Sequence, residues 1–328
     1  MNPVNWSAAE APTHRPMSSP DLAAYLERIG CALSPAPLAK AALLDVIVRA
    51  HSFAIPFESL DVTLHVPISL APSAVFSKLV TSRRGGYCLE NSFLLLAALQ
   101  ALGFDVRLRA ARVWMRAASY TPDDPPIPRA HAVLLVRAGG GDGGGMAGDE
   151  WLVDVGFGGG GPATPLPLRA GAVTAVAGDV FRTDEGVVAA GEDAWVLWGL
   201  HSGAWKRLYS FDHSTWDSPR VHAADFISTN CYVSTTRGTL FDSMRIVSLP
   251  LASGGRVALV NNELKRRSEA EREGHTPVTS VSAVASAAAY RALAAELFGV
   301  TLTEVEARVI FAASAPSPDA HSGGVAAN

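Results

Sequence analysis

The sequence predicts an α+β protein whose first hundred residues are helical and whose middle part is built from β-strands. Up to about residue 102, apolar residues recur at helical spacing. From Val106 onward they alternate with polar residues, as in strands. Proline-rich and glycine-rich connectors separate the short apolar runs that follow. Several short strands joined by such connectors favour a β-barrel or a sandwich.

Composition indicates a globular protein that acts on neither nucleic acid nor membranes. The 328 residues are 48% hydrophobic and 18% charged, which allows two or three domains with sizeable cores. The net charge of −4 gives no electrostatic reason to expect nucleic acid or an anionic membrane as a partner.

The small number of cysteines and the lack of long apolar runs predict a cytoplasmic protein. Three cysteines without a CxxC pair argue against a disulfide framework and against a structural zinc site, so we expect no metal. The first twenty residues lack the apolar core of a secretion signal, and no run of 18 apolar residues occurs.

The first helix has clear boundary signals. Residues 1–18 are expected to be flexible. Ser19 is then expected to be the N-cap, with Pro20 at the first helical position and Asp21 in the first turn. Gly30 ends the apolar periodicity, as expected of a C-terminal glycine.

Three further helices are expected before residue 104. The second covers about residues 37–50, and Pro56 prevents its continuation. The third covers residues 73–82. The fourth includes the apolar run 93–102, whose length and composition predict a buried helix ending at Gly103.

Cys88 is the candidate nucleophile. It follows the Gly85-Gly86 turn and begins the buried helix, where free backbone N–H groups and the helix dipole favour a thiolate. Cys31 and Cys231 lack this placement.

Beyond residue 105 the sequence predicts mainly strands, with helices near the C-terminus. Strands are expected at residues 106–114, 131–136, 151–155, 194–198, 205–209 and 256–260. An alanine-rich helix is expected at residues 283–298, and a Thr303/Glu306 capping box begins a final short helix. The tail from residue 312 has the composition of a disordered segment.

His131 and Asp154 are candidates for the base and for the group that orients it. His131 opens one strand, and Asp154 lies inside the next, where a buried carboxylate needs a partner. A symmetric hairpin around the glycine-rich residues 139–145 pairs residues whose numbers add to 285, which sets His131 opposite Asp154. Taken singly, His131 is more readily a satisfied core histidine and Asp154 an acid at the end of a strand. Their joint placement predicts a Cys-His-Asp site.

A second glycine motif is misleading. Residues 156–161 fit GxGxxG, the dinucleotide fingerprint, which must open a helix. Pro162, Pro165 and Pro167 follow at once and prevent that helix. A flexible segment beside an active site, with room for a bulky acyl carrier, fits better.

Several segments resemble the arylamine N-acetyltransferase family. The helix at residues 21–30 resembles the opening helix of the family, and residues 84–90 resemble its nucleophile motif. The other matching segments are residues 55–61, 130–131, 151–158 and 230–234. The nucleophile motif and the Asp-Val-Gly-Phe-Gly segment, in this order with His131 between them, make the resemblance specific.

The resemblance implies a fold with a cysteine-protease-like Cys-His-Asp core. That fold has an N-terminal helical domain, a central β-barrel and a C-terminal α/β lid. The boundaries expected in this chain are residues 19–104, 105–220 and 221–311, followed by a tail at 312–328.

The activity implied is ping-pong transfer of an acetyl group from acetyl-CoA to an arylamine or arylhydrazine, with no bound cofactor. Cys88 carries the acetyl group as a thioester, and His131 and Asp154 complete the catalytic triad. Glu58 and Arg84 match a family salt bridge that braces the nucleophile loop. The matching substrate contacts are Phe57, Gly156, Phe157 and Gly158.

The chain departs from the family pattern beside the nucleophile. The family usually has Asn four residues after the cysteine, where this chain has Ser92, with Asn91 one position earlier. Three alternatives remain open at this point. They are an amide synthase acting on a carrier-bound acyl chain, a Cys-His-Asp hydrolase, and a non-catalytic binding module.

Overall fold

The structure is a computed structural model of the whole chain. It describes residues 15–33, 38–114, 121–138, 150–176, 178–213, 216, 221–268 and 279–313. The glycine-rich connector at 139–145 and the tail from residue 314 therefore lie outside the described residues.

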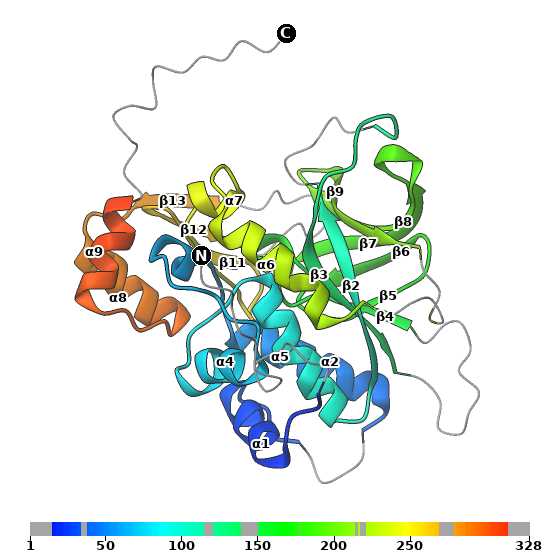
Figure 1. Cartoon of the computed structure of the whole chain (residues 1–328), viewed down its shortest axis with the longest axis horizontal. Helices are drawn as coiled ribbons and strands as arrows, with labels where there is room; N and C mark the ends of the chain where they lie inside the picture. Colours follow the sequence, from blue (N-terminus) through cyan, green and yellow to red (C-terminus); the bar gives the residue numbers. More distant parts are fainter. Residues whose placement is uncertain are drawn as a thin grey trace.

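Helices dominate the N-terminal part, as predicted (Figure 1). They are α1 (Ser19–Arg28), α2 (Lys40–Ala54), α3 (Leu60–Thr63), α4 (Pro72–Phe76), a π-helical turn (Ser77–Thr81) and α5 (Cys88–Ala101). The cap of α1 is Ser18 rather than Ser19, because the Ser18 hydroxyl accepts a hydrogen bond from the backbone N–H of Asp21 at 3.3 Å. The helix predicted at residues 73–82 is present as α4 and the π-helical turn, which follow one another without a break.

Eight antiparallel strands form the second part, a sheet that curls into a nearly closed barrel (Figure 1). Their order is β5-β4-β3-β2-β9-β8-β7-β6. Their bounds are β2 (Asp105–Val113), β3 (Arg129–Arg137), β4 (Glu150–Val153), β5 (Leu166–Pro167), β6 (Ala172–Val176), β7 (Asp179–Val187), β8 (Asp193–His201) and β9 (Ala204–Asp212). This confirms the barrel expectation. Strands β5, β6 and β7 were not predicted from the sequence.

A five-stranded sheet with four helices forms the remainder. Its order is β1-β10-β11-β12-β13, and all its pairings are antiparallel. The elements are β1 (Phe57–Glu58), α6 (Phe226–Thr235), α7 (Leu240–Ser243), β10 (Ile246–Pro250), β11 (Arg256–Val260), β12 (Glu263–Arg267), β13 (Thr279–Ala283), α8 (Ala287–Phe298) and α9 (Glu304–Ala313). Because β1 lies between α2 and α3 in the chain, this sheet ties the helical part to the C-terminal part.

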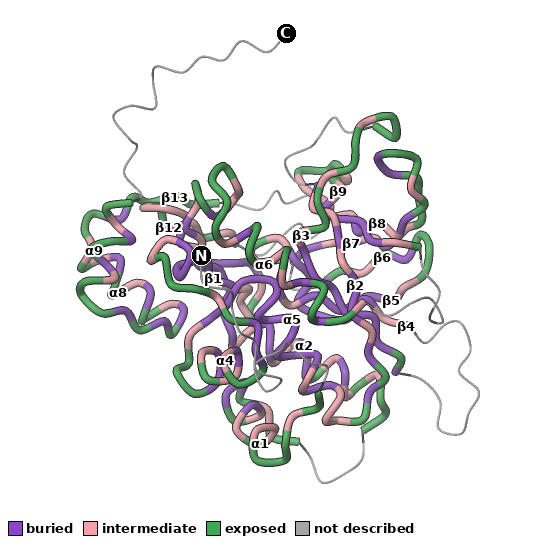
Figure 2. The backbone as a smooth tube through the Cα atoms, viewed as in Figure 1, coloured by how far each residue is buried: buried purple, intermediate pink, exposed green. Residues whose placement is uncertain are grey.

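Helix α5 lies at the centre of the molecule (Figure 2). Eleven of its fourteen residues are buried, and they cover every face of the helix. A helix that is apolar all round is expected to be enclosed by other elements. Here α5 packs against α1, α2 and α4 and against strands β2 and β3. The residue that begins α5 is thereby held between the helical part and the barrel. No helix in the described part of the chain is long and apolar enough to cross a membrane.

Candidate active site

Cys88 is the first residue of α5, as predicted. Tyr87 precedes it in an extended conformation, and the backbone N–H of Tyr87 donates to Glu90 Oε2 at 3.0 Å. The Cys88 side chain is 5% exposed. The sulfur is therefore held in the first turn of the helix and largely shielded from water.

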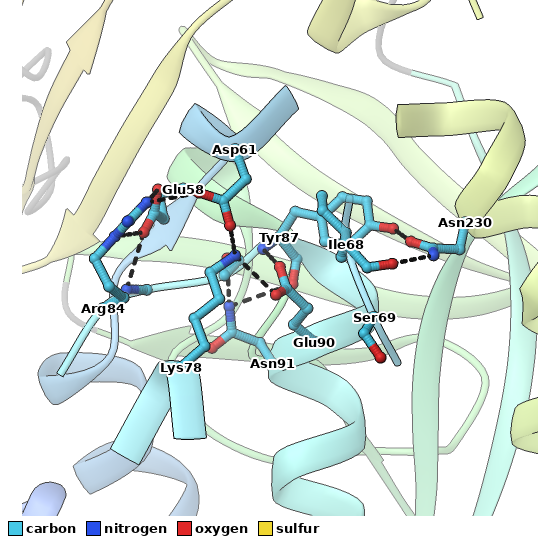
Figure 3. Close-up of polar contacts among 12 residues, drawn as sticks. Glu58, Asp61, Ile68, Ser69, Lys78, Arg84, Tyr87, Glu90, Asn91 and Asn230 are labelled. Carbon is cyan, nitrogen blue, oxygen red and sulfur yellow. Dashed lines mark hydrogen bonds and ion pairs between the residues drawn. The ribbon is translucent and has the colours of Figure 1, made fainter. Parts of the chain in front are cut away.

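The turn before Cys88 is fixed by a buried ion pair (Figure 3). Arg84 donates to Glu58 through Nε at 2.7 Å and through Nη2 at 2.9 Å, and the backbone N–H of Gly85 donates to the same carboxylate at 3.2 Å. Glu58 is 1% exposed. A two-point contact of this kind is both strong and directional, so it holds the loop as well as neutralising the charge.

Two further acids and a lysine extend this network (Figure 3). Lys78 Nζ lies 2.7 Å from Asp61 and 2.8 Å from Glu90. Burial raises the pKa of Glu90 to about 7, although Lys78 and the Tyr87 N–H oppose the shift. For Asp61, burial favours a higher pKa, but the charges of Lys78 and Arg84 hold it below its usual value.

His131 and Asp154 meet, but not in the predicted register. His131 Nε2 lies 2.8 Å from Asp154 Oδ2. Strands β3 and β4 pair Leu134 with Val153, so the paired residue numbers add to 287 rather than 285. Strand β4 also ends at Val153, so Asp154 follows the strand instead of lying inside it.

The carboxylate nevertheless reaches the imidazole, because a slip of two residues keeps a side chain on the same face. Asp154 is a diagonal neighbour of His131, and such neighbours remain within reach of longer side chains. Its other oxygen, Oδ1, accepts from the backbone N–H of Gly156 at 2.9 Å.

The imidazole of His131 is held in its charged form. Burial by itself lowers the pKa of this group, but the Asp154 carboxylate and the Cys88 sulfur together raise it to about 10. Since Nε2 is taken by Asp154, Nδ1 is the ring nitrogen left for the sulfur. Cys88 Sγ lies 3.8 Å from the carbonyl oxygen of Ala130, the residue before His131. The three predicted residues are therefore together at the junction of α5 and the barrel.

Aromatic rings enclose the imidazole on the barrel side. The ring centroids of Phe157 and Tyr209 lie 5.3 Å each from that of His131 and 5.1 Å from each other. Tyr209, on β9, is fully buried, and its pKa is raised well above the usual value by burial and by the Asp154 charge. Sequence reasoning missed Tyr209, because it reaches His131 only through the strand order of the barrel, in which β2 lies between β3 and β9.

Gly156 and Gly158 lie where side chains have no room. A Cβ atom on Gly156 would be 2.8 Å from both Cα and the carbonyl oxygen of Cys88. Gly158 has φ of +71°, and a Cβ there would be 3.1 Å from the Phe57 ring. The predicted contact residues Phe57, Gly156, Phe157 and Gly158 therefore surround the helix start. Residues Gly158–Gly160 form only a short 3₁₀ turn, and no longer helix begins there. This agrees with the argument from the sequence that the glycine motif is not a dinucleotide site.

A polar chain that sequence reasoning also missed supports the turn from the other side. Tyr25 Oη lies 3.0 Å from His51 Nδ1, and His51 Nε2 lies 3.1 Å from Asn91 Oδ1. Asn91 Nδ2 in turn donates to the carbonyl oxygen of Gly86 at 2.6 Å. Burial lowers the pKa of His51 to about 4, so the ring is neutral. The apolar helical pattern around His51 conceals this role in the sequence.

The other cysteines lie in different surroundings. Cys231 is exposed on α6, and burial raises the pKa of the half-buried Cys31 thiol. Across the described ranges, no group of three or more His, Cys, Asp or Glu side chains is arranged to hold a metal ion.

Comparison with known proteins gives a consistent result. Residues 41–307 match the sequence model of a family described as N-acetyltransferase. The arylamine N-acetyltransferase of Mycolicibacterium smegmatis is 41% identical over 224 residues, which are 67% of this chain and 73% of that protein. The solved structure of the arylamine N-acetyltransferase from Salmonella typhimurium is similar, with a TM-score of 0.74 and 28% identity. It covers 90% of this chain and 99% of that one. The Mycobacterium marinum arylamine N-acetyltransferase in complex with CoA gives a TM-score of 0.73 at 30% identity, covering 88% and 98%.

Proposed function

The chain belongs to the arylamine N-acetyltransferase family, and from this premise we propose that it acetylates arylamines through a thioester on Cys88. Acetyl-CoA is the co-substrate. The observation that carries the proposal is the joint geometry of a buried cysteine at a helix start and a charged imidazole paired with Asp154 at 2.8 Å. This arrangement supplies a nucleophile, a proton carrier and a group that orients it.

In the first half-reaction the Cys88 thiolate attacks the carbonyl carbon of acetyl-CoA. A carbon–sulfur bond forms to Cys88, the bond to the CoA sulfur breaks, and the leaving sulfur takes the proton of the His131 imidazolium. Asp154 holds the ring through Nε2, so the proton is delivered from Nδ1. The products are acetyl-Cys88, free CoA and a neutral His131.

In the second half-reaction the amine nitrogen attacks the same carbonyl carbon. The carbon–nitrogen bond forms, the bond to Cys88 breaks, and its electron pair returns to the sulfur. His131 accepts the proton that the amine loses, and the starting ion pair is restored. Phe57 and Phe157 line one small cavity beside Asp154, and aromatic rings at this place suit a flat aromatic acceptor, either an arylamine or an arylhydrazine.

Mass spectrometry after trapping with acetyl-CoA in the absence of amine tests this proposal. We expect one added acetyl group, on the Cys88 peptide, that disappears when an aniline is supplied. Cys231→Ser is the control, since Cys231 is exposed in the middle of α6 and not at a helix start. Labelling of Cys231 instead of Cys88 contradicts the assignment.

The same experiment separates the alternative functions. Malonyl-CoA and propionyl-CoA, run beside acetyl-CoA, give the donor preference. Loss of the acetyl group at the same rate with and without aniline indicates a hydrolase. Acylation by a carrier-bound acyl chain, but not by acetyl-CoA, indicates an amide synthase.

A further inference from the structure

Ser92 makes an unexpected contact for a serine inside a helix. Such a hydroxyl commonly donates to the carbonyl four residues earlier, here that of Cys88. Instead, Ser92 Oγ donates to the carbonyl oxygen of Ala132 on strand β3 at 3.0 Å. The serine is 1% exposed, so water does not compete for this bond.

Two side-chain atoms of α5, Cys88 Sγ and Ser92 Oγ, contact β3. Their spacing along the helix matches the spacing of the carbonyls that they contact along the strand. Cys88 and Ser92 are four residues apart on α5, which is about 6 Å along a helix axis. The carbonyl oxygens that Cys88 Sγ contacts and Ser92 Oγ bonds, those of Ala130 and Ala132, are two residues apart on β3, which is about 6.8 Å along a strand. His131 lies between these acceptors, so the helix face carrying the nucleophile is aligned along the backbone that carries the imidazole.

The neighbouring residues cannot make this connection. Glu90 bonds Lys78 and the Tyr87 N–H. Asn91 bonds Gly86 and faces His51. Each of the three consecutive side chains therefore anchors α5 to a different place, and of the three only Ser92 faces the barrel.

We propose that Ser92 is a positioning residue, which fixes α5 against β3 so that the Cys88 sulfur and the His131 imidazole meet. The remaining contacts between α5 and β3 include apolar packing, which is non-directional and tolerates sliding. A buried hydrogen bond of defined length does not. A misplacement of about 1 Å in such a site can lower the rate about 100-fold. The proposal rests on the proposed function for the role of Cys88.

Ser92→Ala tests the bond, and Ser210→Ala is its matched control. Ser210 is also 1% exposed, and its hydroxyl accepts a buried hydrogen bond from Trp114 Nε1 at 2.8 Å, away from the nucleophile. Two readouts are used, the rate of Cys88 alkylation by iodoacetamide across pH and the melting temperature. We expect both variants to lose similar thermal stability. Only Ser92→Ala should move its alkylation profile to higher pH, by about 1 unit, and slow acetylation about tenfold or more.

Ser92→Thr and Ser92→Val form a second test, because the two side chains have the same shape and differ only in the hydroxyl group. Thr should keep a near-wild-type alkylation profile and Val should not, and this pair decides the matter if Ser92→Ala does not fold. Coinciding profiles for Ser92→Ala and Ser210→Ala, or for Thr and Val, overturn the proposal. A wild-type protein that is not acetylated by acetyl-CoA contradicts the proposed function instead, while the alkylation comparison still tests Ser92.

Discussion

His131 Nε2 and Asp154 Oδ2 lie 2.8 Å apart, with side chains that are 3% and 0% exposed. The contact closes the end of the β3–β4 hairpin, just beyond the last residue of β4. Because both side chains are buried, water cannot screen the pair. The second oxygen of Asp154 accepts a hydrogen bond from the Gly156 N–H. Orientation of the ring is therefore built into the backbone that follows the strand.

Asp154→Asn should lower the rate of Cys88 acetylation by up to ~10⁴, by analogy with the equivalent change in serine proteases. The amide keeps the shape but removes the charge that supports the imidazolium. Single-turnover acetylation by acetyl-CoA measures the effect, with circular dichroism as the check on folding. A folded variant whose rate stays within about tenfold of the wild type contradicts the role of Asp154.

Gly156→Ala should lower the acetylation rate about 100-fold, because the new methyl group meets backbone atoms of Cys88 at 2.8 Å and must displace them. Gly159→Ala is the control from the same glycine run. Its Cβ would meet nothing closer than 3.8 Å, so it should behave as the wild type. Equal rates for the two variants would show that the close approach has no catalytic consequence.

His51 should make stability depend on pH on the acidic side. Its pKa is lowered to about 4 in the folded state, mainly by burial, whereas an unfolded histidine has a pKa near 6.5. Between these values the unfolded chain binds more protons, so the free energy of unfolding falls as the pH falls, by on the order of 3 kcal/mol.

Urea denaturation at pH 7 and at pH 4.5 measures this contribution. His51→Gln, which keeps one donor and one acceptor but does not titrate, should lose less stability than the wild type between these two pH values. His65→Gln, at an exposed histidine, should retain the wild-type dependence. A His51→Gln protein with an unchanged pH dependence places the titration elsewhere.

Lys78→Met should destabilise the protein by about 3–5 kcal/mol at pH 8, because it leaves Asp61 and the buried Glu90 facing each other without their shared cation. Lys265→Met is the control. Lys265 pairs with Glu263 at the surface, where loss of an ion pair costs less than about 1 kcal/mol. Equilibrium unfolding in urea gives both values, and similar losses for the two variants contradict a structural role for Lys78.

Local sequence signals were sufficient to predict where several helices and strands begin. The helix start at Cys88 follows from Gly85-Gly86 and the apolar run that comes after it, and the structure begins α5 at this residue. The change from helical to alternating periodicity near Val106 is likewise real, since β2 begins at Asp105. Both are properties of adjacent residues, which propensity and periodicity record directly.

The register of the β3–β4 hairpin depended on more than its sequence. The sequence-based estimate was wrong by two residues, because it assumed a symmetric loop across residues that carry no register signal. Asp154 was correctly matched with His131 because an even slip preserves the face of the strand, whereas an odd slip would have reversed it.

Residue types and periodicity were sufficient to predict the fold class and to select Cys88, His131 and Asp154 as the candidate triad. Only the tertiary structure decided that Tyr209 lies over His131, that His51 supports the Gly86 turn through Asn91, and that Ser92 bonds Ala132. These contacts join residues 40 to 78 positions apart. Sequence periodicity reports which face of an element is buried. Which partner covers that face is set by how the helices and the barrel pack together.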